Sequence, residues 1–400
     1  HYYKSWCLIR LGKTAEAQIA IATAEKEPAD YCFPNALEAI EALQCVVDFA
    51  GKAPKALYYL GNLWYDKRRY PTAIAAWERS SREDETFPTV WRNLSLAYFN
   101  KMNRPDEAVA LLEKAFRLDH TDARVLMELD QLYKRLNRPH IERLCFLEQH
   151  IDIVMTRDDL YLEYVTLLNQ TGQYREAIRR IDQRKFHPWE GGEGKVPAQY
   201  QLARLELAKE LIIRKKYDDA LALIDECYIY PAHLGEGKLP GAQENDFNYY
   251  KAYILQQQGR PEEAHSLFVK ASSGNSQPAA AMYYNDQKPD KIFYQGLAYR
   301  KLGEEEKARS RFNQLITYGE EHLFDRFKMD YFAVSLPDLL IWEDDMDKKN
   351  RIHCNYLMAL GHLGLGNRTK AEHFFDIAAS MDNNHQGVQI HRKLMNTILS

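Results

Sequence analysis

The chain has 400 residues, of which 46% are hydrophobic and 28% charged, so it has enough apolar material for a core and does not resemble a disordered chain. Lys and Arg number 53 and Asp and Glu 57, and the formal net charge of −4 argues against a nucleic-acid-binding or polybasic membrane protein. No uninterrupted apolar run approaches the roughly 20 residues that a membrane span needs.

The start of the chain and its cysteines bear on the compartment. The first residue is His1 rather than Met, and Tyr2 to Ile9 already follow an amphipathic helix pattern, so we expect a fragment of a longer chain. The six cysteines contain no Cys-x-x-Cys pair, which disfavours a metal site or a disulfide scaffold. This cysteine usage suits a reducing compartment and favours the cytoplasm, although any export signal would be missing from such a fragment.

One sequence pattern recurs nine times along the chain. It consists of a turn residue, an Ala five positions later and a large apolar residue nine positions later. Ala occupies its place in eight of the nine copies, where ordinary usage would give about one. The copies are Gly12/Ala17/Ile21, Arg68/Ala73/Trp77, Asn103/Ala108/Leu112, Asn137/Glu142/Phe146, Gly172/Ala177/Ile181, Lys215/Ala220/Ile224, Gly259/Ala264/Phe268, Gly303/Ala308/Phe312 and Gly366/Ala371/Phe375.

The spacing within each copy predicts a pair of helices joined by a short turn. A large side chain usually stands four positions before the turn, and in six copies a small residue stands seven positions before it, so both lie on one helix face. One pair cannot cover its own apolar stripe, and successive pairs must therefore stack. We predict an all-α, right-handed superhelical solenoid of about nine helix-turn-helix repeats.

The distances between turn residues divide the chain into three stretches of one continuous solenoid. They are 56, 35, 34, 35, 43, 44, 44 and 63 positions. Residues 1–50 form a divergent first repeat with an extra helix at Asn35–Ala50, which begins after Pro34. Residues 53–184 form regular repeats of about 34 residues, and residues 185–400 form expanded or irregular repeats with long loops. No Pro/Gly/Ser-rich linker separates these stretches.

The regular stretch resembles the tetratricopeptide repeat. The residues that carry this resemblance are Leu60-Gly61, Trp64, Tyr70, Ala73 and Trp77. The resemblance covers nearly the whole chain and is strongest from 53 to 184. It implies a scaffold that binds other proteins.

Two of the long loops are alike in sequence. Each contains Gly-Glu-Gly-Lys before a Pro and a new helix, and because equivalent loops of a solenoid project from one edge, we expect them to be neighbours. Aromatic, acidic, amide and His side chains would then line a rim suited to a sugar or a polar peptide, or would simply brace the loops. The candidate rim residues are His187, Trp189, Glu193, Lys195, His233, Glu236, Lys238, Tyr284, Asn285 and Asp286.

A second resemblance rests on longer strings of residues. Phe186 to Lys195, Glu244-Asn245-Asp246, Tyr283–Gln287 and Asp330–Asp338 resemble the C-terminal part of large bacterial proteins that carry the domain of unknown function DUF5107. In that family a β-rich, carbohydrate-associated region precedes a tetratricopeptide array. The resemblance implies a bacterial source and a sugar-related parent protein, but it supplies no catalytic residue.

Some tetratricopeptide modules clamp the C-terminal carboxylate of a chaperone tail with cations and Asn residues on their first helices. The matching places here are Tyr58, Asn62, Asn93, Arg124 and Glu128. Glu128 stands where a cation should contact the anion, so the charge pattern of the clamp is broken. Tyr58, Asn62, Asn93 and Arg124 remain candidates for a peptide-binding groove.

Motifs for catalysis are missing from the sequence. It contains no Gly-x-Ser-x-Gly elbow, His-Glu-x-x-His or Gly-x-Gly-x-x-Gly, and His353-Cys354, His187 and His233 do not make a metal-ligand set. We expect no cofactor and no metal. The leading hypothesis is a non-enzymatic scaffold that binds a peptide, a partner protein or another domain of its parent through the groove and the loop rim. The alternative is an accessory region of a carbohydrate-active protein, whose rim loops contact sugar or a neighbouring catalytic domain.

Overall fold

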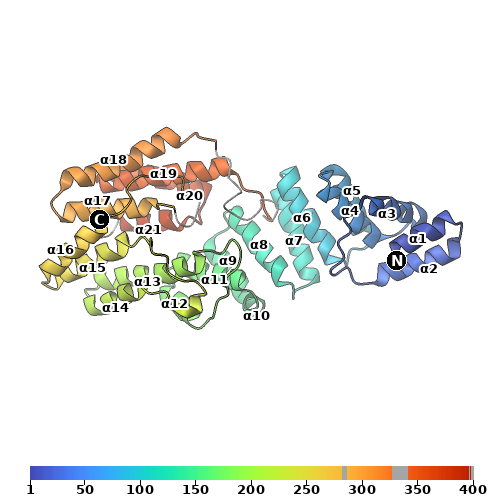
Figure 1. The fold of residues 1–400 in the computed structure, drawn as a ribbon, viewed down its shortest axis with the longest axis horizontal. Coiled ribbons are helices and arrows are strands. Elements are labelled where there is room, and N and C mark those ends of the chain that lie inside the picture. The colour runs from blue at the N-terminus through green and yellow to red at the C-terminus, as the bar shows by residue number, and fades with distance from the viewer. Residues whose placement is uncertain (282–285, 327–340, 396, 398–400) are drawn as a thin grey trace. The chain divides into compact units, whose positions relative to one another are not determined.

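The computed structural model of the chain describes residues 1–281, 286–326, 341–395 and 397. These residues form 21 α-helices and one 3-10 helix, with no strand among them (Figure 1). The expected all-α, helical-repeat solenoid is confirmed. The Asp330–Asp338 stretch and the candidate rim residues Tyr284 and Asn285 lie outside the described residues.

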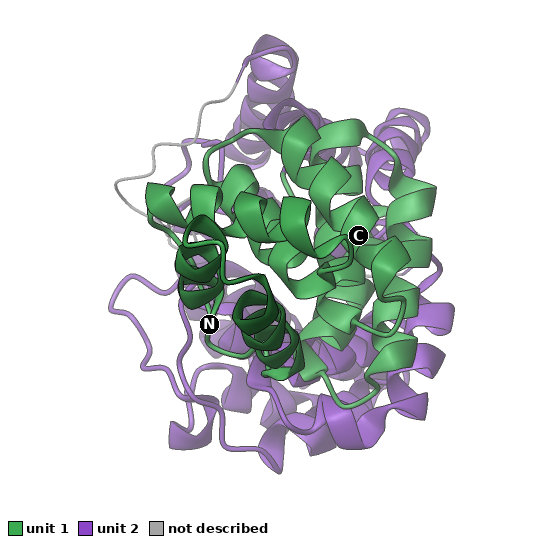
Figure 2. Cartoon of the chain, turned by 90° about the vertical axis from the view of Figure 1, so that its right-hand side faces the viewer, with its two compact units in different colours: residues 1–136, 340–343 green, residues 137–339, 344–400 purple. Residues whose placement is uncertain are grey.

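The chain divides into two compact units (Figure 2). The first contains His1–Leu136 together with 341–343, and the second contains the other described residues from Asn137 onward. Each unit is a stack of helix pairs, and the single continuous superhelix stays a prediction. The helices of the first unit are α1 (Tyr2–Arg10), α2 (Thr14–Lys26), α3 (Leu37–Ala50), α4 (Pro54–Asp66), α5 (Tyr70–Glu83), α6 (Pro88–Met102), α7 (Pro105–Leu118) and α8 (Ala123–Arg135).

The second unit contains four consecutive helix pairs, α13/α14, α15/α16, α17/α18 and α19/α20, which follow α9 to α12 and precede α21. Its helices are α9 (His140–Gln149), α10 (Ile151–Val154), α11 (Asp158–Gln170), α12 (Tyr174–Asp182), α13 (Lys195–Ile213), α14 (Tyr217–Cys227), η1 (Ala232–Leu234), α15 (Asn245–Gln257), α16 (Pro261–Ser272), α17 (Pro289–Lys301), α18 (Glu305–His322), α19 (Met346–Gly364), α20 (Arg368–Met381) and α21 (Gln386–Leu394).

The nine turn residues all adopt the backbone conformation that ends a helix. Their φ angles lie between 52° at Asn103 and 80° at Gly172 and Gly303. This left-handed conformation satisfies the last carbonyls of the preceding helix, and Gly adopts it without steric cost. Gly occupies five of the nine turn positions. The left-handed conformation favours Gly, which explains why the turn of each repeat could be recognised in the sequence.

The Ala of each repeat lies at the closest contact between helices. All eight are at most 2% exposed, and seven of the nine large residues that follow are fully buried, with Ile21 and Phe146 more exposed. The fourth copy departs from the prediction, because Glu142 is exposed and Phe146 only partly buried. Pro139 caps α9, which starts one residue later than the other second helices, and this delay moves the buried places to Arg143 and Leu147.

The small residue before the turn makes room for the large residue after it. A Cβ atom built on Gly61 would lie 2.3 Å from Nε1 of Trp77. We expect Gly61→Ala to lower the free energy of unfolding by about 1–3 kcal/mol, as overpacked cores do. Urea denaturation would measure this, with Gly237→Ala as the control because a Cβ at Gly237 meets no atom within 4 Å. Equal stability of both variants would contradict the prediction.

The end of the second unit folds back on its beginning. Asn383 bonds Asn137, Asn384 bonds Arg143 and Gln170, and Gln386 bonds Gln199 of α13. Rings of α17 and α19 contact His391 of α21. The last helix of the unit therefore lies between α13, α17 and α19 (Figure 1), where it closes one side of a cavity.

Candidate functional site

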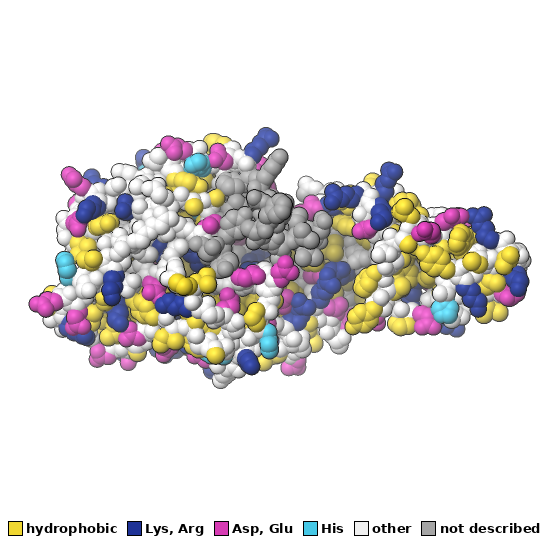
Figure 3. Space-filling view, in the orientation of Figure 1, with side chains coloured by type: hydrophobic (Ala, Val, Ile, Leu, Met, Phe, Trp, Pro, Cys, Tyr) yellow, Lys and Arg dark blue, Asp and Glu magenta, His cyan; other side chains and the backbone are white. Residues whose placement is uncertain are grey.

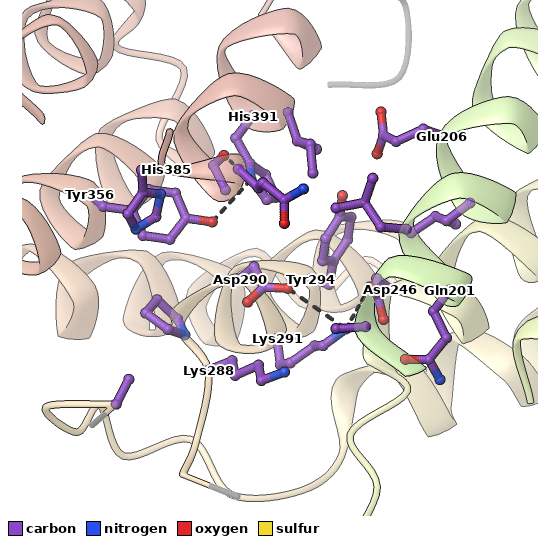
Figure 4. Close-up of a pocket in the computed structure, with 18 of the residues that line it drawn as sticks. Gln201, Glu206, Asp246, Lys288, Asp290, Lys291, Tyr294, Tyr356, His385 and His391 are labelled. Carbon is purple, nitrogen blue, oxygen red and sulfur yellow. Dashed lines mark hydrogen bonds and ion pairs between the residues drawn. The ribbon is translucent and has the colours of Figure 1, made fainter. Parts of the chain in front are cut away.

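A cavity of about 390 Å³ lies in the second unit, between the first helices of four consecutive repeats and α21 (Figure 4). The first helices are α13, α15, α17 and α19, whose inward faces form the inner surface of the stack. The volume is in the range of sites that bind small molecules or short segments of a ligand. The acidic, basic and imidazole side chains that line it are Glu206, Lys209, Asp246, Lys288, Asp290, Lys291, His353, His385 and His391.

A lysine between two carboxylates is the most strongly charged feature of the cavity. The Nζ atom of Lys291 lies 2.5 Å from Oδ2 of Asp246 and 3.7 Å from Oδ2 of Asp290. Burial acts to lower the pKa of Lys291, but the two carboxylates outweigh it and the pKa is raised. Burial acts to raise the pKa of Asp290, but the cations around it, Lys291 first, bring the pKa below its usual value. Lys291 and Asp290 are therefore both ionised at neutral pH.

Lys288 stands at the edge of the same cluster. Its side chain is exposed, and it makes no ion pair with any acidic residue that the structure describes. The surrounding protein and the charge of Lys291 lower the pKa of Lys288. Lys288 is thus a cation that is available to a ligand at the cavity.

Three histidines line the cavity, and two of them, His385 and His391, lie opposite Lys288 and Lys291 in Figure 4. Nδ1 of His391 lies 2.8 Å from the carbonyl oxygen of Gly387 and 3.0 Å from the hydroxyl oxygen of Tyr356. Because the carbonyl can only accept and the hydroxyl can accept as well, a proton on Nδ1 satisfies both contacts. His385 caps α21 by accepting a hydrogen bond from the backbone N–H of Val388 at its Nδ1, 3.1 Å away. Nε2 of His353 donates to the carbonyl of Ala279 at 2.8 Å. Burial lowers the pKa of His353 and of His391 to about 4, so both rings are neutral at pH 7.

Two buried acceptor atoms of the cavity have no hydrogen-bond partner among the described residues. They are Oδ1 of Asp246, whose residue is 5% exposed, and Nε2 of His391, whose residue is 4% exposed. Because its Nδ1 carries the proton, neutral His391 presents a lone pair at Nε2. Buried polar groups are nearly always satisfied in proteins, and each exception costs about 1–3 kcal/mol. Both atoms therefore suit a ligand that donates hydrogen bonds.

The two other charged side chains of the cavity, Glu206 and Lys209, pair with each other. Glu206 and Lys209 form an ion pair one turn apart on α13, and both are buried. They add no net charge. No group of three or more His, Cys, Asp or Glu side chains in the described part of the chain has the arrangement of a metal site.

The candidate groove residues lie together in the first unit. Asn62 accepts hydrogen bonds from the indole of Trp77 at 3.1 Å and from Asn93 at 3.0 Å. Asn93 also accepts from Arg92 at 3.3 Å, and Arg92 donates twice to Glu128 at 2.5 and 2.6 Å.

The remaining two groove candidates flank this network. The ring of Tyr58 packs on Phe87 and is nearly buried, whereas the side chain of Arg124 donates to Glu128 at 3.0 Å and is 59% exposed. A ladder of hydrogen bonds thus joins α4, α6 and α8, and Glu128 of α8 accepts from two arginines at its end. Arg124 is the groove candidate most accessible to a partner.

The two Gly-Glu-Gly-Lys loops lie side by side, as their likeness predicts. The backbone N–H of Phe186 donates to the carbonyl of His233 at 2.8 Å, and the N–H of Gly194 donates to the carboxylate of Glu236 at 2.7 Å. Burial, followed by the charge of Glu193, raises the pKa of Glu236, although the hydrogen bond from Gly194 acts to lower it. Glu236 therefore holds one loop against the other.

The remaining rim candidates brace their own loops or face solvent. The backbone and ring of His187 bond Asp158, the ring of Trp189 covers Gly192, and Lys238 donates to the carbonyl of Tyr228. Glu193 and Lys195 are exposed. The carbonyl of Asp286 accepts from Gln243 at 3.1 Å. None of these rim residues lines the cavity described above.

Sequence reasoning missed the cavity. Two signals pointed to it: Glu206 and Lys209 stand among the apolar residues Leu205, Leu207, Ala208 and Leu211, and Lys288 and Lys291 flank Asp290 at a helix start. Charged residues on the inner face of a first helix indicate a polar cavity, whereas those on the outer face are simply solvated. The other residues that line this cavity lie on α19 and α21, far away in sequence. Repeat spacing alone does not bring them together.

Comparison with known proteins agrees with the fold. Residues 88–122, which contain α6 and α7, and residues 292–318, in α17 and α18, match tetratricopeptide-repeat family models. The fold is similar to that of a tetratricopeptide repeat protein from Parabacteroides merdae, with 14% identity over 74% of this chain and 96% of that chain and a TM-score of 0.31.

Two further solved structures are similar. One is Naa15/Naa10 bound to HypK-THB, with 12% identity over 89% of this chain and 63% of that chain and a TM-score of 0.40. The other is PilF of Pseudomonas aeruginosa, with 13% identity over 66% of this chain and 91% of that chain and a TM-score of 0.22.

The chain therefore carries tetratricopeptide repeats in both units. Proteins of this class are generally non-catalytic scaffolds that bind other proteins. In the face shown in Figure 3, acidic and basic side chains are interspersed, and no broad basic patch appears among its described residues. None of the described helices combines the length and apolarity needed to cross a membrane.

Proposed function

We propose that this chain is a scaffold that binds a polypeptide partner and that the cavity of the second unit receives part of that partner. One observation carries the proposal: four consecutive first helices, together with α21, place ion pairs, imidazoles and two unpaired acceptors around a single space of about 390 Å³. Burying such groups costs stability, so an inner surface built only for packing would be apolar.

A polypeptide fits this lining better than an apolar ligand does. Its backbone N–H groups can donate to the acceptors of Asp246 and His391, and its side chains can contact the apolar walls that Leu202 and Ile390 provide. Affinity would come from a few buried contacts of this kind rather than from total area. The groove of the first unit, where exposed Arg124 lies near Tyr58, Asn62 and Asn93, is a second candidate site for a polypeptide.

The test is to select binding peptides from a displayed library of random twelve-residue peptides, with the full chain as the target. Ala198 lines the cavity on the first turn of α13, and Ala198→Trp fills part of the space. We expect this variant, and Lys288→Glu at the cavity edge, to weaken binding of the selected peptides about tenfold or more. Lys185→Glu is the matched control, since Lys185 is exposed and lies outside the cavity lining.

The outcomes separate the candidate sites. Selected peptides that bind wild type and Ala198→Trp equally would overturn the assignment to the cavity. If Arg124→Ala then abolished binding, the groove of the first unit would be the site. If no peptide were selected and a glycan array gave binding that Trp189→Ala removes, the chain would instead be an accessory region of a DUF5107-type, carbohydrate-active parent.

A further inference from the structure

The ionised groups of the cavity are unevenly distributed. Asp246 and Asp290 share one cation, Lys291, so this cluster carries a net charge of −1. Glu206 and Lys209 cancel each other. The exposed Lys288 supplies the balancing positive charge at the edge. A complementary ligand places a cation next to the two carboxylates and an acceptor or an anion next to Lys288.

The two acceptor atoms without a partner also call for a ligand that donates hydrogen bonds near the carboxylates. Oδ1 of Asp246 and Nε2 of His391 both accept hydrogen bonds, and neither has a partner among the described residues. They come from α15 and α21, on different sides of the cavity, and Asp290 of α17 lines the same cavity (Figure 4). The end of a polypeptide can satisfy both sides, because its ammonium group has three donors for the carboxylates and the following peptide bonds have N–H donors for the imidazole.

We propose that the cavity captures the free N-terminus of the polypeptide partner, with its α-ammonium group held by Asp246 and Asp290, a backbone N–H of the same chain end donating to His391, and its first carbonyl or acidic side chains facing Lys288. This inference rests on the proposed function and specifies the chemistry of the partner. Because α21 closes one side of the cavity, the end of a polypeptide can enter it more easily than an internal segment, which would have to pass through. A C-terminal carboxylate would add a third anion beside Asp246 and Asp290, and like charges at that distance repel strongly.

The experiment compares two synthetic pools of random dodecapeptides. The pools have the same sequences and differ only in the N-terminal amino group, which is free in one pool and acetylated in the other. Both contain the same lysine side chains, so only the α-ammonium group distinguishes them. We expect the chain to retain peptides of the free pool and acetylation to weaken the binding of individual selected peptides about tenfold to a hundredfold, as the loss of charge-assisted hydrogen bonds does.

Two variants connect this effect to the cavity. Asp246→Asn should weaken binding of the free peptides by about the same factor. His391→Asn keeps a donor at the place of Nδ1 but removes the acceptor at Nε2, and it should have a smaller effect of the same sign. Melting curves show whether each variant is folded, and the comparison of acetylated with free peptides on the wild-type chain needs no variant.

Each result decides the matter. Peptides that bind equally with and without acetylation, and that Ala198→Trp still excludes, would overturn the N-terminal assignment while leaving the proposed function in place. Failure of both pools to bind would overturn both. Loss of binding on acetylation that Asp246→Asn and Ala198→Trp do not reproduce would place N-terminal recognition outside the cavity and overturn this inference.

Discussion

Replacing Arg143 with Met should lower the free energy of unfolding of the second unit by about 3–5 kcal/mol, the usual cost of breaking a buried ion pair from one side. Arg143 is 1% exposed and stands where the other repeats have Ala. It donates to Glu163 of α11 at 2.8 Å and to Asn384, just before α21, at 2.7 Å. The variant leaves the carboxylate of Glu163 buried without this cation and loosens the contact that closes the unit.

Hydrogen exchange measured by mass spectrometry on the full chain would locate this effect. We expect faster exchange in α9, α11 and α21 and little change in α4 to α7 of the first unit. The double variant Arg143→Met/Glu163→Leu removes both charges, and it should recover most of the lost stability because apolar replacements of a buried ion pair are often neutral. A double variant less stable than Arg143→Met would show that the ion pair is not the cause.

Arg143 also marks the limit of the sequence analysis of the fold. The turn residues and the buried Ala residues repeat at fixed offsets because left-handed turns and close helix contacts tolerate few residue types, so their places could be predicted. Pro139 delays the start of α9 by one residue, and this shift exchanges Glu142 for Arg143 at the core. A pattern of fixed sequence offsets does not locate the start of a helix to within one residue, so it could not predict this shift.

The candidate site was harder to predict for a different physical reason. Neighbouring repeats contact each other in chain order, which is why the two Gly-Glu-Gly-Lys loops could be expected side by side. The cavity depends on α21 returning to α13, as the bond between Gln199 and Gln386 shows, across 187 positions. The rim loops were conspicuous because they are long, but the two acceptor atoms of the cavity that lack a described partner belong to Asp246 and His391, on helices.

Acid should destabilise the second unit well above the pH at which its carboxylates are protonated. Burial lowers the pKa of His353 and of His391 to about 4, from an ordinary value near 6.5 in the unfolded chain. The unfolded state therefore binds protons first as the pH falls, and the stabilising effect of the neutral rings, complete above pH 6.5, is lost between 6.5 and 4. Linkage gives a loss of about 2 kcal/mol for each of the two histidines between pH 7 and pH 5. Burial lowers the pKa of His385 as well, which adds in the same direction.

Urea denaturation at pH 7 and pH 5 tests this with His391→Asn and a matched control. His391 faces Asp290, which favours its protonation, and Lys209 and Lys291, which together with burial oppose it. Removing the ring should shrink the difference in unfolding free energy between the two pH values by about 2 kcal/mol. Val388→Ala deletes buried methyl groups on the same helix, so it should lower stability equally at both pH values. If His391→Asn and wild type lose the same free energy on acidification, then His391 is not held neutral in the folded chain, and the lone pair at its Nε2 is not available to a ligand at pH 7.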